Sequence, residues 1–107
     1  ISRSEDLHGS LNISDYPNLD TVEIYGQKNL INLQINNCDN LRSLVVSDNN
    51  LTNLNINHLK DLEVLDIRDN NLTELNVQNL VNLKELDFIN NYLGGHSATI
   101  KGIKYFI

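Results

Sequence analysis

Histidine, cysteine and acidic residues are the side chains of this chain that could do chemistry, and their spacing favours none of it. The three histidines, His8, His58 and His96, lie in different sequence contexts and share no metal-ligand spacing. No Ser/His/Asp or Cys/His group can be assembled, and Gly94-Gly95 is not followed by the Lys-Ser or Lys-Thr pair of a phosphate-binding loop. The sequence therefore predicts no enzyme, no metal site and no cofactor.

The chain repeats itself along most of its length. LRSLVVSDNNLTNLNINHLKD begins at Leu41, LEVLDIRDNNLTELNVQNLVN begins at Leu62 and LKELDFINNYL begins at Leu83, so successive copies are 21 residues apart (62 − 41 = 83 − 62). An earlier copy begins at Leu19 with one extra residue beside Lys28 and Asn29. We place the repeats at 7–18 (partial), 19–40, 41–61, 62–82 and 83–95 (partial), followed by a closing segment at 96–107. A fixed period of this length predicts one solenoid domain of stacked coils.

Each unit reads LxxLxΦxxNNLTxLNΦxxΦxx, where Φ is apolar, and it resembles the leucine-rich repeat family, whose units carry LxxLxLxxN on a strand. The second half of the unit, LTNLNI or LTELNV, repeats the spacing of the first and is a poor helix former. This doubled form is similar to the short 21-residue internalin-like subtype (LxxLxLxxNxLxxLxL) of some bacterial surface proteins. The resemblance implies a β-rich, right-handed solenoid, with parallel strands on a concave face, short extended segments on the convex side and little or no helix.

Alternation along the extended segments predicts which side chains point into the solenoid. Asn49, Asn70 and Asn91 recur where the first segment ends, so we expect them to form a ladder that bonds the backbone of the corner. Gln27 takes this place in the first matched unit, and we expect it to break the ladder. The apolar residues predicted to point inward are Val22, Ile24, Leu44, Val46, Leu65, Ile67, Leu86 and Phe88, with Leu33, Ile35, Leu54, Ile56, Leu75 and Val77 opposite them.

The single cysteine and the three glycosylation sequons both follow from the repeat. Cys38 falls at the inward position that Leu59 and Leu80 occupy later, which predicts a small buried hydrophobe, with a reactive or metal-bound thiol as the alternative. The sequons begin at Asn12, Asn50 and Asn71, and the last two are products of the repeat itself. We therefore interpret the sequons as coincidence.

Composition narrows the class of partner. The formal net charge of −6 over 107 residues disfavours nucleic acid and anionic membrane surfaces and favours a protein with a basic surface. The chain has no apolar run long enough to span a membrane, and the compartment stays open. Because the chain starts at Ile1, we expect an excerpt of a longer protein. We expect the closing segment, 96–107, to be either a strand that covers the last coil or the start of another domain.

Outward residues of the first segment line up in columns across the coils. Asp66 and Asp87 should lie side by side, with Arg68 one outward step away. The resemblance implies that this concave face binds the ligand, which predicts a non-catalytic protein-interaction module; the alternative is a structural spacer or stalk. Candidate binding residues on this face are Glu23, Tyr25, Val45, Val64, Asp66, Arg68, Asp87 and Ile89.

Overall fold

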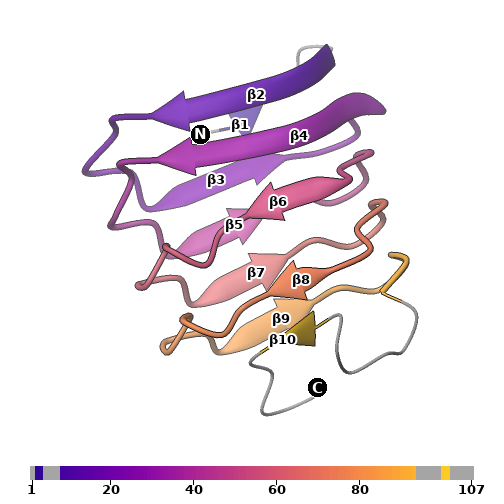
Figure 1. Cartoon of the computed structure of the whole chain (residues 1–107). Helices are drawn as coiled ribbons and strands as arrows, with labels where there is room; N and C mark the ends of the chain where they lie inside the picture. Colours follow the sequence, from indigo (N-terminus) through magenta and orange to yellow (C-terminus); the bar gives the residue numbers. More distant parts are fainter. Residues whose placement is uncertain (1, 4–7, 94–99, 102–107) are drawn as a thin grey trace.

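The computed structural model describes residues 2–3, 8–93 and 100–101, and every regular element in them is a β-strand. One layer of the fold is a five-stranded parallel sheet, here called sheet A. Its strands follow one another in the order β1, β3, β5, β7 and β9 (Figure 1). Their bounds are Ser2–Arg3, Thr21–Ile24, Ser43–Val45, Val64–Asp66 and Glu85–Asp87.

The opposite layer holds the second extended segment of each coil (Figure 1). Strands β2 (His8–Ser14), β4 (Asn29–Asn36) and β6 (Asn53–Asn55) form the parallel sheet B. Strand β8 (Leu75–Asn76) continues this layer and pairs in parallel with β10 (Ile100–Lys101). The described part of the chain is thus a parallel-strand β-solenoid without a helix, and so without a helix that could cross a membrane.

The strand register in sheet A follows the sequence repeat. Val22 pairs with Leu44, Leu44 with Leu65, and Leu65 with Leu86, which are offsets of 22, 21 and 21 residues. Parallel pairing at the aligned LxΦ segments is therefore confirmed. The second segment of the unit is extended as well, because strand β6 lies within Leu51–Ile56 and no helix forms there. Strands β5, β7 and β9 each end one residue before the second inward side chain of their unit.

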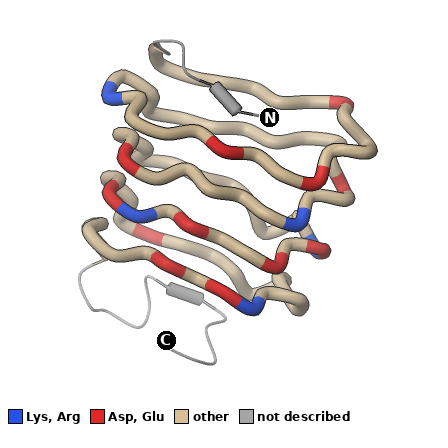
Figure 2. The backbone as a smooth tube through the Cα atoms, turned by 180° about the vertical axis from the view of Figure 1, so that it is seen from behind, with Lys and Arg blue, Asp and Glu red and all other residues tan. Residues whose placement is uncertain are grey.

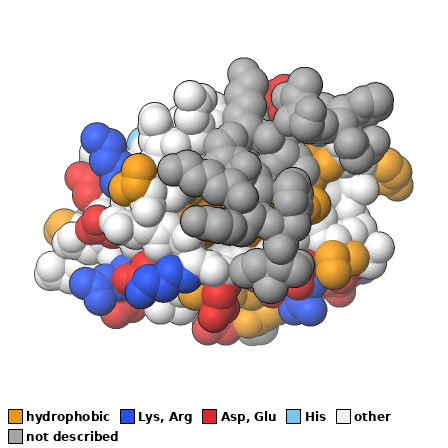
Figure 3. Space-filling view, turned by 90° about the horizontal axis from the view of Figure 1, so that it is seen from below, with side chains coloured by type: hydrophobic (Ala, Val, Ile, Leu, Met, Phe, Trp, Pro, Cys, Tyr) orange, Lys and Arg blue, Asp and Glu red, His pale blue; other side chains and the backbone are white. Residues whose placement is uncertain are grey.

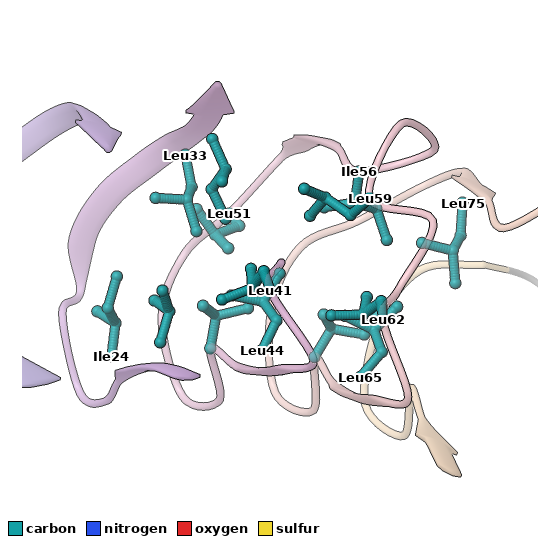
Figure 4. Close-up of a cluster of buried hydrophobic side chains, with 14 of the residues drawn as sticks. Ile24, Leu33, Leu41, Leu44, Leu51, Ile56, Leu59, Leu62, Leu65 and Leu75 are labelled. Carbon is teal, nitrogen blue, oxygen red and sulfur yellow. The ribbon is translucent and has the colours of Figure 1, made fainter. Parts of the chain in front are cut away.

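The core is a column of leucine, isoleucine and valine side chains between the two layers (Figure 4). Almost all the residues predicted to point inward are buried; Leu54, Leu86 and Phe88 are partly buried and pack against the same cluster. Each buried side chain contributes about 1.5–3 kcal/mol, so the column holds neighbouring coils together. Cys38 is fully buried, as predicted, and its Sγ lies 3.3 Å from the carbonyl oxygen of Asn36.

The predicted asparagine ladder is present at the corners after β5, β7 and β9. Asn49 Nδ2 donates to the carbonyls of Val46 (2.9 Å) and Ser47 (3.1 Å) in its own coil and of Ile24 (3.1 Å) in the preceding coil. Asn70 and Asn91 repeat this pattern one and two coils later. Backbone groups that the tight turn leaves unpaired are thereby satisfied inside the protein.

The expectation that Gln27 breaks the ladder is wrong. Gln27 is buried, and its Nε2 donates to the carbonyl of Tyr25 at 3.2 Å, the bond that Asn49 makes to Ser47. The backbone N–H of Gln27 in turn donates to Asn49 Oδ1 at 2.8 Å. The longer amide side chain therefore extends the ladder by one coil. The irregularity lies instead in the opposite layer, where the β2–β4 register shifts between Gly9 and Ser10.

The closing segment lies mostly outside the described residues, as do Gly94-Gly95, His96 and Leu7. Its described part, β10, pairs in parallel with β8, so Ile100 aligns with Leu75. β10 thus lies next to the second extended segment of the 62–82 repeat.

Candidate functional site

Three columns of side chains cross the outer face of sheet A, the face that the sequence predicts to bind. The first two columns take register partners from β3, β5, β7 and β9. The third takes the residues one or two positions after these strands, where backbone hydrogen bonds such as those of Asp48 to Arg68 and of Asp69 to Ile89 continue the pairing. Acidic residues outnumber basic ones on this side of the solenoid (Figure 2). The first column is Thr21, Ser43, Val64 and Glu85, the central column is Glu23, Val45, Asp66 and Asp87, and the third column is Tyr25, Ser47, Arg68 and Ile89.

Arg68 joins the two aspartates of the central column. Asp66 and Asp87 are register partners on β7 and β9, as predicted, so two carboxylates lie on adjacent strands. The Nε of Arg68 donates to Asp66 Oδ1 at 2.9 Å and Oδ2 at 3.1 Å, and it lies 3.5 Å from Asp87 Oδ2. The side chain of Asp66 is only 18% exposed, whereas that of Arg68 is 47% exposed. The cation thus offsets much of the repulsion between the two anions.

Both aspartates also bond the backbone at the strand ends. Asp66 Oδ1 accepts a hydrogen bond from the N–H of Arg68, and Asp87 Oδ1 accepts one from the N–H of Ile89, each at 3.2 Å. These bonds fix the orientation of the carboxylates. The hydrogen bond to Asp66 raises the pKa of Arg68 above its ordinary value.

Tyr25 and Glu23 form a second polar pair at the other end of the face. The Tyr25 hydroxyl donates to Glu23 Oε2 at 2.6 Å. This hydrogen bond raises the pKa of Tyr25 above its ordinary value, with smaller contributions from burial and from the charges of Glu23 and Asp66. The charge of Arg68 lowers the pKa of Tyr25 and so opposes the contribution of Asp66.

Uncharged residues separate and flank these pairs. Val45 and Ser47 lie on the coil between them, where Val45 is half-buried and Ser47 is buried. Val64 is also half-buried, while Tyr25 and Ile89 are 48% and 62% exposed. The face therefore presents exposed apolar side chains at both ends of an ordered acidic centre. Seen from the β9 end of the stack, acidic, basic and apolar side chains of the described residues lie close together (Figure 3).

The outer surface of the opposite layer is chemically uniform. Amide side chains bond one another from coil to coil, as Asn36 Nδ2 does with Asn12 Oδ1 at 3.3 Å. Gln34, Asn53, Asn55 and Asn76 add exposed amides, and Ile31 is the large apolar side chain exposed on β4. Such a surface offers few distinct chemical features to a partner.

The His58 side chain makes a contact between coils. His58 Nε2 lies 2.6 Å from the carbonyl oxygen of Ile35, which ties two coils together. Within residues 8–93, no group of three or more His, Cys, Asp or Glu side chains is arranged to hold a metal ion. Asn71 Nδ2 of one sequon donates to Asn50 Oδ1 of another, whereas Asn12 is exposed.

Sequence reasoning missed three features of the face: the Tyr25–Glu23 hydrogen bond, the aspartate bonds to the strand ends and the burial of Ser47. The i, i+2 spacing of Glu23 with Tyr25 and of Asp66 with Arg68 is the signal that could have found the first two. Comparison with known proteins finds no matching family model, no matching curated protein and no matching solved structure.

Proposed function

We propose that this chain is a non-catalytic protein-interaction module that binds a partner with a basic surface on the outer face of sheet A. The observation that carries the proposal is the ordering of the Asp66–Arg68–Asp87 cluster by side-chain and backbone bonds. A surface whose charged groups are already held in place loses little conformational entropy on binding. Exposed Ile89 beside the cluster, and exposed Tyr25 at the other end of the face, supply apolar contact area of the kind that anchors interfaces.

The proposal includes membership of the leucine-rich repeat family, in its short internalin-like form. Support comes from the LxxLxΦxxN spacing, from the strands at those segments and from the asparagine at each corner. A family of this kind would use the strand face of the solenoid for binding. The net charge of −6 adds long-range attraction toward a basic protein.

The experiment begins with the isolation of partners for the wild-type chain from a displayed protein library. The affinity of each isolated partner is then measured with Ile89→Ala, Tyr25→Ala and the matched control Ile31→Ala, whose residue is 45% exposed on the other layer. We expect a loss of about tenfold for at least one sheet A variant, because truncation of an anchor costs more than about 1 kcal/mol. The control should change affinity by less than about twofold.

A structural spacer is the competing function. A short stack of coils could hold neighbouring domains apart without binding anything, and its charged face would then only be solvated. Failure to isolate any partner, or equal losses for Ile31→Ala and Ile89→Ala, would favour the spacer over the interaction module.

A further inference from the structure

Val45 lies between two acidic residues on the outer face of sheet A. The register pairs it with Glu23 on β3 and with Asp66 on β7. Because neighbouring strands are ~4.8 Å apart, the backbones at the two acidic positions are about 10 Å apart with one half-buried aliphatic side chain between them. An aliphatic stem that carries a cation can lie on such a strip and leave its charged end between the two carboxylates.

Ser47 adds an independent polar group to this place. Its side chain is buried, with 7% of the residue exposed, and its hydroxyl has no hydrogen-bond partner among the described residues. Every fully occluded side-chain nitrogen or oxygen in that part of the chain has a partner, so the Ser47 oxygen must remain reachable from outside. Backbone pairing continues past β5, because the N–H of Val46 donates to the carbonyl of Asp66 and the N–H of Asp48 to that of Arg68, so alternation from Val45 directs Ser47 to the outer face. A mostly buried hydroxyl without a partner is a position that a ligand can complete.

The two carboxylates that flank Val45 in the register retain acceptor capacity. Glu23 receives the Tyr25 hydroxyl on Oε2, and its Oε1 has no partner among the described residues. Asp66 is held by Arg68 Nε, but each carboxylate oxygen can accept more than one hydrogen bond. Three acceptors on three coils, Glu23, Ser47 and Asp66, thus border the aliphatic side chain of Val45.

We propose that Glu23, Val45, Ser47 and Asp66 form a subsite for a lysine side chain of the partner. The lysine stem lies on Val45, and the ammonium donates to Glu23, Asp66 and the Ser47 hydroxyl. An ammonium suits three acceptors in different directions, whereas the planar arginine fork suits one carboxylate bound side by side. This subsite rests on the proposed function, because it names the group by which the basic partner is anchored.

The test is a titration of the isotope-labelled chain with Nα-acetyl-lysine amide, followed by nuclear magnetic resonance. We expect the largest shift changes at the Val45 methyl groups and the Ser47 amide. Ser47→Ala and Glu23→Gln should each weaken binding about fivefold, the effect of one lost hydrogen bond. Glu74→Gln, an exposed carboxylate before β8 on the other layer, is the matched control and should leave the titration unchanged.

Three results would overturn the subsite: equal shift changes with the neutral Nε-acetyl derivative, equal binding of the arginine analogue, or shift changes spread over all surface carboxylates. The dispersion of the amide signals shows in the same spectra that each variant is folded. The titration uses no partner protein, so its failure leaves the comparison of Ile89→Ala with Ile31→Ala standing. Conversely, failure of that comparison alone would remove the proposed function and leave a measured lysine site.

Discussion

At the scale of single residues, one asparagine per coil satisfies backbone groups from two coils at once. Asn70 Oδ1 accepts from the N–H of Leu51 at 3.1 Å, and Nδ2 donates to the carbonyls of Val46, Ile67 and Arg68 at 2.7, 3.1 and 3.1 Å. The sequence could predict this role because the amide recurs at a fixed place and offers both donors and an acceptor. It could not predict that Gln27 joins the ladder, because that depends on the side-chain rotamer.

Asn70→Ala should lower the free energy of unfolding by about 1–3 kcal/mol, because buried backbone groups lose their partner. Asn55, exposed and outward on β6, provides the control, and Asn55→Ala should cost less than about 0.5 kcal/mol. Denaturant melts of both variants measure the difference. Equal losses would contradict the assignment of inside and outside positions.

The Tyr25–Glu23 bond predicts a measurable shift in tyrosine ionisation. Its hydrogen bond raises the pKa of Tyr25, so the stabilisation from this bond is complete below the unfolded-state pKa and is lost as pH rises through the folded-state pKa. An alkaline titration followed by tyrosinate absorbance, compared with Tyr25→Phe, isolates this residue. Glu23→Gln should move the Tyr25 component to lower pH, and an unmoved component would show that the bond is absent in solution.

At the scale of elements, the corners after β3, β5, β7 and β9 each turn through a residue in the left-handed backbone region. Asp48, Asp69 and Asn90 have φ values of 56°, 57° and 60°, and Gly26 takes the same place in the first coil. Glycine, asparagine and aspartate tolerate this conformation best. The glycine, aspartate and asparagine at this position could therefore have predicted the corner from the sequence. Asn90 Nδ2 also donates to Asp69 Oδ1 at 2.7 Å, which links successive corners.

Replacing Asp69 by glycine and by alanine isolates the cost of this conformation. Both variants lose the bond to Asn90, so Asp69→Gly should be more stable than Asp69→Ala by about 1 kcal/mol, the penalty of a side chain in the left-handed region. At Thr73, exposed and without a positive φ, the order should reverse. Thermal melts of the four variants measure these differences in stability. Equal stability of Asp69→Ala and Asp69→Gly would mean that the corner changes its backbone conformation to accommodate alanine.

How much of the fold could be predicted also differs between elements. The strands β3 to β9 of sheet A follow from the LxxLxΦ spacing, because alternation and the buried column both select that register. Strand β1 could not be predicted, because its two residues carry no part of the repeat. The shift at Gly9 and Ser10 likewise depends on how the extra residue of the next coil is accommodated, a choice that spacing alone leaves open.

At the scale of the whole molecule, stacking of the coils brings acidic residues of successive coils close together, so that their electrostatic potentials add. Asp66 and Asp87 are register partners, and the net charge of the chain is −6. Stacking places like residues of successive coils at strand spacing, so the repeat sums their potentials over one face. The positions of these residues were predictable from the sequence, whereas the sharing of Arg68 between two coils depends on a rotamer.

Asp87→Asn tests whether this field serves binding. Two like charges about 5 Å apart repel by roughly 1 kcal/mol in water, and asparagine keeps an oxygen for the N–H of Ile89. Because the substitution removes this repulsion and also the ion pair with Arg68 at 3.5 Å, the two effects oppose each other and stability should be unchanged or slightly raised, while a basic partner binds more weakly at low salt. At high salt the two affinities should converge, because exposed charges are screened. Unchanged affinity at both salt concentrations would remove Asp87 from the binding face and leave Tyr25, Val45, Val64 and Ile89 as its contacts.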